Sequence, residues 1–233
     1  MNEKLRNVYE IEMKNIYSEL NAYNKNVTKD KKATNPFLIS VNENYSESKN
    51  SIMIFGQETN GWCGECGEAS EYSKSIDKSL ETYVSFYLKG GISKYRGPFW
   101  NEFKRIKKEV GKSKNAVFVW NNINKIGRIG KGNVTEINEI QFREPSIVKA
   151  ELKILKPQIL VFLTGNDYNH FIEQNIEKFE EKKLSESLTE LKFTNEFKHL
   201  KVFKTFHPNA LYHQGKNKSV ISNLIDEIKK ACI

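Results

Sequence analysis

Four short apolar runs of the chain each end in a group of polar side chains. These groups are Gln57 with Glu58, Asn121 with Asn122, Thr164 to Asn166, and His207 to Asn209. A carboxylate can activate water, and an amide can donate to and accept from the edge of a heterocycle. A histidine can donate to an oxygen that gains charge. If they converge, these groups predict an acid–base and hydrogen-bonding site at one place in the fold.

The apolar runs before these groups predict four buried strands, at 52–55, 116–120, 159–163 and 202–206. Segments between them have the periodicity of helices, so strands and helices alternate. The exception is 124–142, which is rich in Gly and Asn and which we expect to be irregular. This alternation is typical of a mainly parallel sheet covered on both faces. Because the carboxyl ends of parallel strands lie on one edge, we expect the four polar groups to converge there.

Composition indicates a globular protein with a polyanionic partner. The 233 residues are 38% hydrophobic and 28% charged, and the net charge is +8. Nucleic acid is the first candidate partner, although a lysine-rich composition can also reflect solubility and genomic bias. We expect one domain spanning 1–233, in which 1–35 form an N-terminal helical extension. Leu5, Val8, Ile16 and Leu20 lie on the apolar face of that helix.

The sequence also favours a cytoplasmic protein. No apolar stretch reaches the roughly 20 residues of a membrane span, and the N-terminus lacks the apolar core of a secretory signal. The three cysteines are an odd number, which favours a reducing compartment over a disulfide framework.

Taken in order, the polar groups resemble the motifs of the uracil-DNA glycosylase superfamily. Gly56-Gln57-Glu58-Thr59-Asn60-Gly61 resembles the first motif, and His207-Pro208-Asn209-Ala210-Leu211 resembles the second. The runs ending at Asn121 and Gly165 resemble the core strands between them, and Phe99-Trp100 resembles a helix start. The resemblance covers about residues 50–228. It implies a three-layer α/β/α sandwich with a four-stranded, mainly parallel central sheet.

The resemblance also implies an activity. Such enzymes flip a deaminated or modified, uracil-like base out of DNA and hydrolyse its N-glycosidic bond. Glu58 takes the position of the water-activating carboxylate, and His207 that of the group that stabilises the departing base. Gln57 and Asn121 take base-binding positions. We expect a monomer with no metal and no cofactor that acts on single- or double-stranded DNA.

Other positions would contact the flipped base or the surrounding DNA. Tyr95 or Phe99 would stack on the base, with Phe86 a further candidate. Leu211 takes the position of an apolar wedge that fills the hole left in the duplex, and Asn209 lies beside it in the same motif. Basic residues near the predicted edge would bind phosphates. They are Lys94, Arg96, Lys125, Arg128, Lys131, Lys216 and Lys218.

Trp62-Cys63-Gly64-Glu65-Cys66 gives a competing signal after the first strand. It resembles the thioredoxin redox motif, in which a thiol pKa is lowered. The two cysteines with His207 and His213 would also make a zinc ligand set. Packing of an incidental thiol pair is the ordinary alternative. A further alternative is a non-catalytic nucleic-acid or nucleotide-binding module on the same fold.

Overall fold

The computed structural model describes all residues of the chain except 60, 68, 133 and 143–145. The chain divides into two compact units, each made of three segments. The first unit comprises Met1–Val41, Glu58–Gly91 and Asn122–Lys156; the second comprises Asn42–Gln57, Ile92–Asn121 and Pro157–Ile233. None of the helices in the described part of the chain has the length and apolar character needed to cross a membrane.

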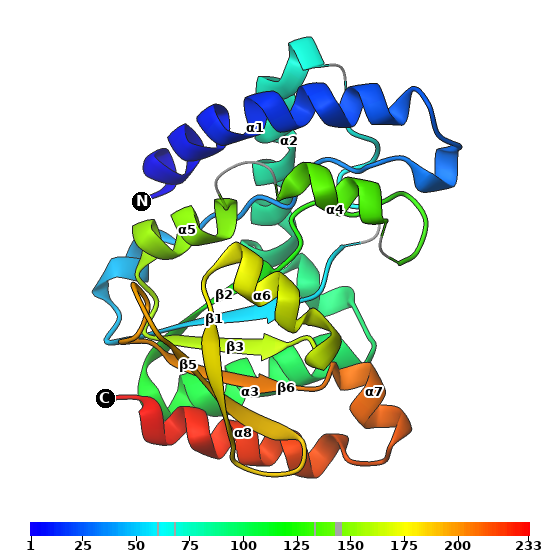
Figure 1. The fold of residues 1–233 in the computed structure, drawn as a ribbon. Coiled ribbons are helices and arrows are strands. Elements are labelled where there is room, and N and C mark those ends of the chain that lie inside the picture. The colour runs from blue at the N-terminus through cyan, green and yellow to red at the C-terminus, as the bar shows by residue number, and fades with distance from the viewer. Residues whose placement is uncertain (60, 68, 133, 143–145) are drawn as a thin grey trace. The chain divides into compact units, whose positions relative to one another are not determined.

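A six-stranded sheet organises the second unit, with strand order β2-β1-β3-β6-β5-β4 (Figure 1). The strands predicted from the apolar runs are β1 (Asn50–Gly56), β2 (Ala116–Asn122), β3 (Ile159–Leu163) and β6 (Lys201–Thr205). Strand β3 pairs in parallel with β1 on one side and with β6 on the other. Every residue of β1 and β3 is buried, as expected of strands covered on both faces. The predicted α/β class is confirmed.

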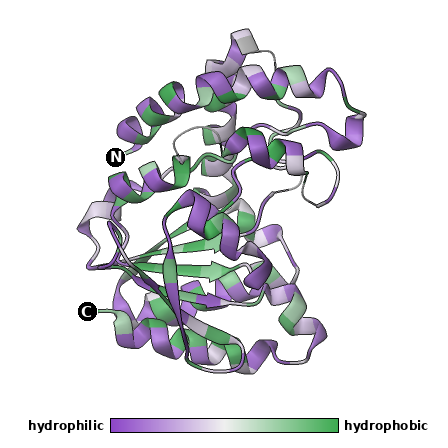
Figure 2. Ribbon diagram, in the orientation of Figure 1, coloured by the Kyte–Doolittle hydropathy of each residue, from purple (hydrophilic) through white to green (hydrophobic). Residues whose placement is uncertain are grey.

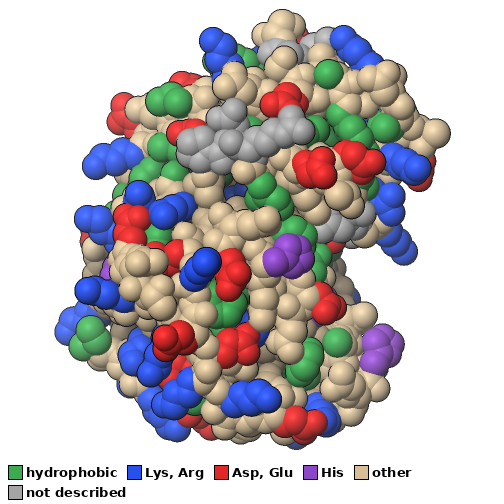
Figure 3. Space-filling view, in the orientation of Figure 1, with side chains coloured by type: hydrophobic (Ala, Val, Ile, Leu, Met, Phe, Trp, Pro, Cys, Tyr) green, Lys and Arg blue, Asp and Glu red, His purple; other side chains and the backbone are tan. Residues whose placement is uncertain are grey.

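The predicted count of four strands is wrong, because β4 (Phe179–Lys183) and β5 (Leu188–Phe193) extend the sheet as an antiparallel hairpin. Strand β4 is largely exposed and reads Phe-Glu-Glu-Lys-Lys, a charged edge that discourages pairing with other chains. Figure 3 shows acidic and basic side chains interspersed in this region. Lys204 of β6 is buried and bonds Glu181 of β4, with 2.6 Å between Nζ and Oε1.

Helices α3 (Pro98–Lys114), α7 (Pro208–His213) and α8 (Asn217–Ala231) pack together in the second unit. Helix α3 contacts β1, and α8 contacts β5 and β6. Pro98 occupies the first turn of α3, where a proline is tolerated. The short helix α6 (Asn169–Asn175) follows β3. Figure 2 shows hydrophobic residues along the central strands and hydrophilic residues on the outer parts of the helices.

The first unit is helical. Helix α1 (Asn2–Asn24) packs against α2 (Tyr72–Tyr83), α4 (Thr135–Gln141) and α5 (Ile147–Leu155). The predicted N-terminal helix is therefore present, whereas the prediction that 124–142 is irregular missed α4. Short 3-10 or π turns complete the chain, at Lys29–Lys31, Glu43–Glu47, Ala69–Glu71, Val84–Leu88, Gly91–Lys94 and Asn166–Tyr168.

A buried ion pair joins three parts of the first unit. Lys125 Nζ lies 2.7 Å from Glu151 Oε2, and the Tyr9 hydroxyl donates to Glu151 Oε1 at 2.7 Å. The Lys125 ammonium also lies 5.3 Å from the centre of the Phe37 ring. Burial lowers the pKa of Lys125, and Glu151 opposes that effect. Lys125 is 3% exposed, so it does not present a charge to phosphates as the sequence predicted.

Replacing Glu151 with alanine is expected to destabilise the protein strongly, because it leaves the Lys125 ammonium buried without its counter-charge. Breaking such a pair from one side costs roughly 3–5 kcal/mol. Urea unfolding of E151A measures the loss. The control is E71A, which breaks the exposed Glu71–Lys74 pair and should leave the midpoint nearly unchanged. If the two variants unfold at the same urea concentration, the ion pair does not have this role.

Candidate functional site

The carboxyl ends of β1, β3 and β6 meet at one edge of the sheet in the second unit. Gln57, just after β1, donates from Nε2 to the Thr164 carbonyl at 2.8 Å. The Gly165 amide donates to the Thr205 carbonyl at 3.0 Å. Gly165 has a φ of +82°, and a Cβ there would lie 3.9 Å from the His207 amide nitrogen. Three of the four polar groups predicted to converge are thus neighbours.

His207 is the best-defined acid–base group at this edge. It caps the N-terminus of α7, and its Nδ1 accepts from the Asn209 amide at 3.2 Å. Burial lowers the pKa of the imidazole from its usual 6.5, so the neutral form prevails at pH 7. Because Nδ1 is an acceptor, the neutral ring carries its proton on Nε2. His207 can therefore donate one hydrogen bond to an oxygen without being charged.

Aromatic rings at the start of α3 hold the imidazole in place. Phe99 lies nearly parallel to the His207 ring, with 5.7 Å between centroids and 11° between planes. Trp100 packs edge-on against Trp120 of β2, with centroids 4.7 Å apart. Of the three aromatic residues proposed to stack on a base, Phe99 is beside His207, and Tyr95 lies on the surface, 49% exposed. Phe86 belongs to the first unit.

Asn121, the residue expected to bind the base, is not exposed. It is fully buried at the end of β2, and its Nδ2 donates to Met53 Sδ at 3.3 Å. Both residues belong to the second unit, so the amide is engaged inside the sheet. Because Asn121 has no exposed surface, a base could reach this amide only if the packing around it changed.

The placement of Leu211 does not match the predicted wedge. A side chain that enters a duplex must project from the surface, but Leu211 is 0% exposed. It turns inward because α7 packs on α3 and α8. The next residue of α7, Tyr212, projects instead and is 64% exposed. Asn209, in the first turn of the helix, is also exposed.

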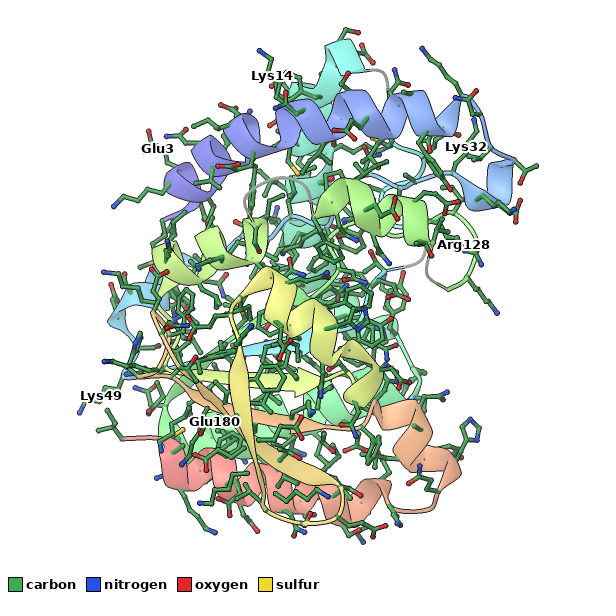
Figure 4. The ribbon with its side chains drawn as sticks, viewed as in Figure 1. Glu3, Lys14, Lys32, Lys49, Arg128 and Glu180 are labelled. Atoms are coloured by element: carbon green, nitrogen blue, oxygen red, sulfur yellow. The ribbon has the colours of Figure 1, made fainter. Side chains whose placement is uncertain are left out.

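Apart from the buried Lys125, the basic residues predicted to bind DNA fall into three environments. Lys94 and Arg96, in the segment before α3, are exposed, as are Lys131 and Lys218. Lys216, just before α8, is paired with Glu186 at 3.0 Å, which reduces its attraction for phosphates. Arg128 belongs to the first unit, on the loop between β2 and α4 (Figure 4). Its Nε is buried and has no hydrogen-bond partner within the described ranges.

Glu58 follows Gln57 directly but belongs to the first unit, where it is half-buried. The next residue, Thr59, is packed so tightly on Gly127 that a Cβ at Gly127 would lie 1.9 Å from the Thr59 carbonyl oxygen. Only glycine fits there, so this packing fixes the backbone next to Glu58. Asn60, the following residue of the resembling motif, lies outside the described residues.

Asn124 in the first unit is a polar residue that the sequence analysis did not single out. It is 1% exposed, and neither Nδ2 nor Oδ1 has a hydrogen-bond partner in the part of the chain that the structure describes. A buried amide left unpaired is costly, so such a group is often kept for a function. Its sequence signal was an amide between two isoleucines, Ile123 and Ile126, just after a buried strand.

The cysteine pair does not have the environment of a redox motif. Cys63 is half-buried and Cys66 buried, and both thiols are free. Burial raises the pKa of both, that of Cys66 to about 12, whereas a redox pair needs a lowered value. Asn35 holds the loop by donating to the Cys63 and Glu65 carbonyls, each at 3.0 Å. Among the described residues, no three His, Cys, Asp or Glu side chains are grouped to hold a metal ion.

Comparisons with known proteins do not assign a family to the chain. No protein-family model matches the chain, and no curated protein matches it significantly.

Replacing Asn124 with leucine, which has a similar shape, is expected to stabilise the protein. The substitution removes an unpaired buried amide and should raise the free energy of unfolding by about 1–3 kcal/mol. The matched control is N35L, since Asn35 is equally buried but hydrogen-bonded; this variant should be less stable than wild type. Urea unfolding compares all three proteins. A loss of stability in N124L similar to that in N35L would contradict the assignment of Asn124 as an unpaired amide.

Proposed function

We propose that the protein is a DNA glycosylase-like hydrolase that releases a deaminated or modified, uracil-like base from DNA. The observation that carries the proposal is the placement of His207 at the edge where β1, β3 and β6 end, with its Nδ1 accepting from the Asn209 amide. The order of the motifs along the chain, which resembles the uracil-DNA glycosylase superfamily, supports the same reaction.

The chemistry requires stabilisation of the departing base. When the N-glycosidic bond breaks, its electron pair goes to the base, and negative charge collects on a carbonyl oxygen. A neutral donor suits this oxygen because its hydrogen bond strengthens as the charge develops. The cap on Asn209 and the ring of Phe99 hold His207 in one orientation, so little reorganisation is needed during the reaction.

The same reaction needs a group that activates water. In our proposal Glu58 accepts a proton from water as the water oxygen bonds to the sugar carbon. Support for this role comes from the position of Glu58 directly after Gln57, which contacts the end of β3. The tight contact of Thr59 with Gly127 fixes the backbone on the other side of Glu58.

One observation favours a second candidate, a nucleic-acid-binding module without catalysis. Asn121, the residue expected to read the base, is fully buried and bonded to Met53. A protein that binds DNA without extruding a base has no need of an exposed amide at this position. This candidate predicts salt-dependent binding to DNA and no release of any base.

Base release distinguishes the two candidates. Oligonucleotides that carry uracil, hypoxanthine or xanthine are incubated with the protein, and cleavage at abasic sites is measured on gels. We expect release of at least one base, with a loss of about 10²–10³-fold in H207A from the missing donor. E58Q should also be strongly impaired. H199A, at an exposed histidine in the turn before β6, is the control and should keep full activity. Absence of release from every substrate would exclude the glycosylase proposal.

The lowered pKa of His207 predicts a pH dependence of stability. The folded state resists protonation of the half-buried ring, whereas the unfolded chain takes up the proton near pH 6.5. The stabilising contribution is therefore complete above pH 6.5 and is lost as the pH falls through the folded pKa. Urea unfolding between pH 7.5 and 5 should show a smaller pH slope in H207Q than in wild type. Equal slopes would show that the pKa of His207 is the same in the folded and unfolded states.

A further inference from the structure

Two tyrosines stand out on the surface of the second unit. Tyr212 on α7 is 64% exposed, and Tyr95 in the segment before α3 is 49% exposed. Among described residues of this unit, the only other large hydrophobic side chain with comparable exposure is Ile233, the last residue of the chain. Tyr95 lies just before α3 and Tyr212 lies within α7, and these two helices pack on each other.

The segments that carry these tyrosines contain no acidic residue. Neither 82–101 nor 197–225 includes an Asp or Glu. Lys94 and Arg96 flank Tyr95 and are exposed, and Lys218 follows Tyr212 and is exposed. In a chain with 29 acidic residues, this charge pattern favours a polyanion next to the aromatic rings.

Hydrogen bonds and ring packing hold the backbone around both tyrosines. Tyr95 donates its amide to the Ile92 carbonyl at 3.1 Å, and its own carbonyl accepts from Lys104 Nζ of α3 at 2.8 Å. Helix α7 is held at its start by the cap of His207 and by the stack of His207 on Phe99 of α3. A rigid aromatic side chain loses little conformational entropy when it binds.

We propose that this surface, made of Lys94, Tyr95, Arg96, Tyr212 and Lys218, binds single-stranded DNA. Tyr212 stacks on an unpaired base, Tyr95 stacks on a second, and the three cations contact phosphates. The inference rests on the proposed function for its choice of DNA. It adds the class of substrate, an unpaired strand, and assigns the protruding side chain of α7 to Tyr212 in place of Leu211.

An unpaired strand fits this surface better than a duplex does. Bases in a duplex are stacked on each other, so a tyrosine ring can reach their faces only at an end or at a disrupted step. A single strand presents every base face, and base–aromatic stacking tolerates any sequence. The apolar residue expected to open a duplex, Leu211, is buried. The exposed rings of Tyr95 and Tyr212 can stack on unpaired bases.

Fluorescence anisotropy tests the inference, with a labelled single strand of about 15 nucleotides and with its blunt duplex. The DNA contains only the four normal bases. We expect wild type to bind the single strand at least roughly tenfold more tightly than the duplex. Y212A should bind the single strand about 5- to 150-fold more weakly, whereas Y212W should stay close to wild type. Because Tyr212 is exposed, far-UV circular dichroism should show that both variants remain folded.

The salt dependence of binding tests the role of Lys94 and Arg96. The double variant K94A/R96A should reduce the slope of log affinity against log salt by about 0.7 for each phosphate that is no longer neutralised. The control is K201A, because Lys201 lies at the opposite end of β6 from α7 and is exposed; it should keep the wild-type slope. An unchanged slope in K94A/R96A would remove these residues from the interface.

The outcomes separate this inference from the proposed function. Equal binding of Y212A and wild type, or tighter binding of the duplex, overturns the single-strand surface even if bases are released. Binding that depends on Tyr212, without release of any base, supports the surface and removes the glycosylase.

Discussion

The parallel pairing of β1, β3 and β6 is the constraint on which the candidate site depends. Because β3 pairs in parallel with both neighbours, the three strands end at the same edge of the sheet. Gln57, Gly165 and His207 become neighbours for this reason, although about 150 residues of sequence separate the first from the last. A shift of one residue in this pairing would turn the alternating side chains to the opposite faces and separate these groups.

Buried lysines inside each unit are matched with carboxylates, and this limits which residues are available for function. Lys125 is neutralised by Glu151, and Lys204 by Glu181. Each pair stabilises its unit in the sense that removal of one partner would leave an uncompensated charge. Asn124 is different, because its amide is buried without a partner among the residues described. His207 is different in another way, since its Nδ1 is capped while Nε2 keeps a proton to donate.

The sequence predicted the elements whose signal is local. The four apolar runs became strands, and the periodic N-terminal segment became α1. The hairpin of β4 and β5 was missed because its edge strand is almost entirely charged, a pattern that resembles a solvated loop. The burial of Lys125 depends on Glu151, 26 residues away, so no local pattern could reveal it. Leu211 and Tyr212 are adjacent, and only the packing of α7 on α3 decides which of them is exposed.

The central claim is that His207 is a neutral donor through Nε2 at the sheet edge. Two-bond proton–nitrogen correlation NMR on the protein labelled at its histidine ring nitrogens tests this most directly, with H207Q used to assign the His207 signals. At pH 7 we predict a neutral His207 ring with a protonated Nε2 and an unprotonated Nδ1. A ring protonated on both nitrogens, or on Nδ1 alone, would contradict the account, because it could not offer a neutral Nε2–H donor to the departing base.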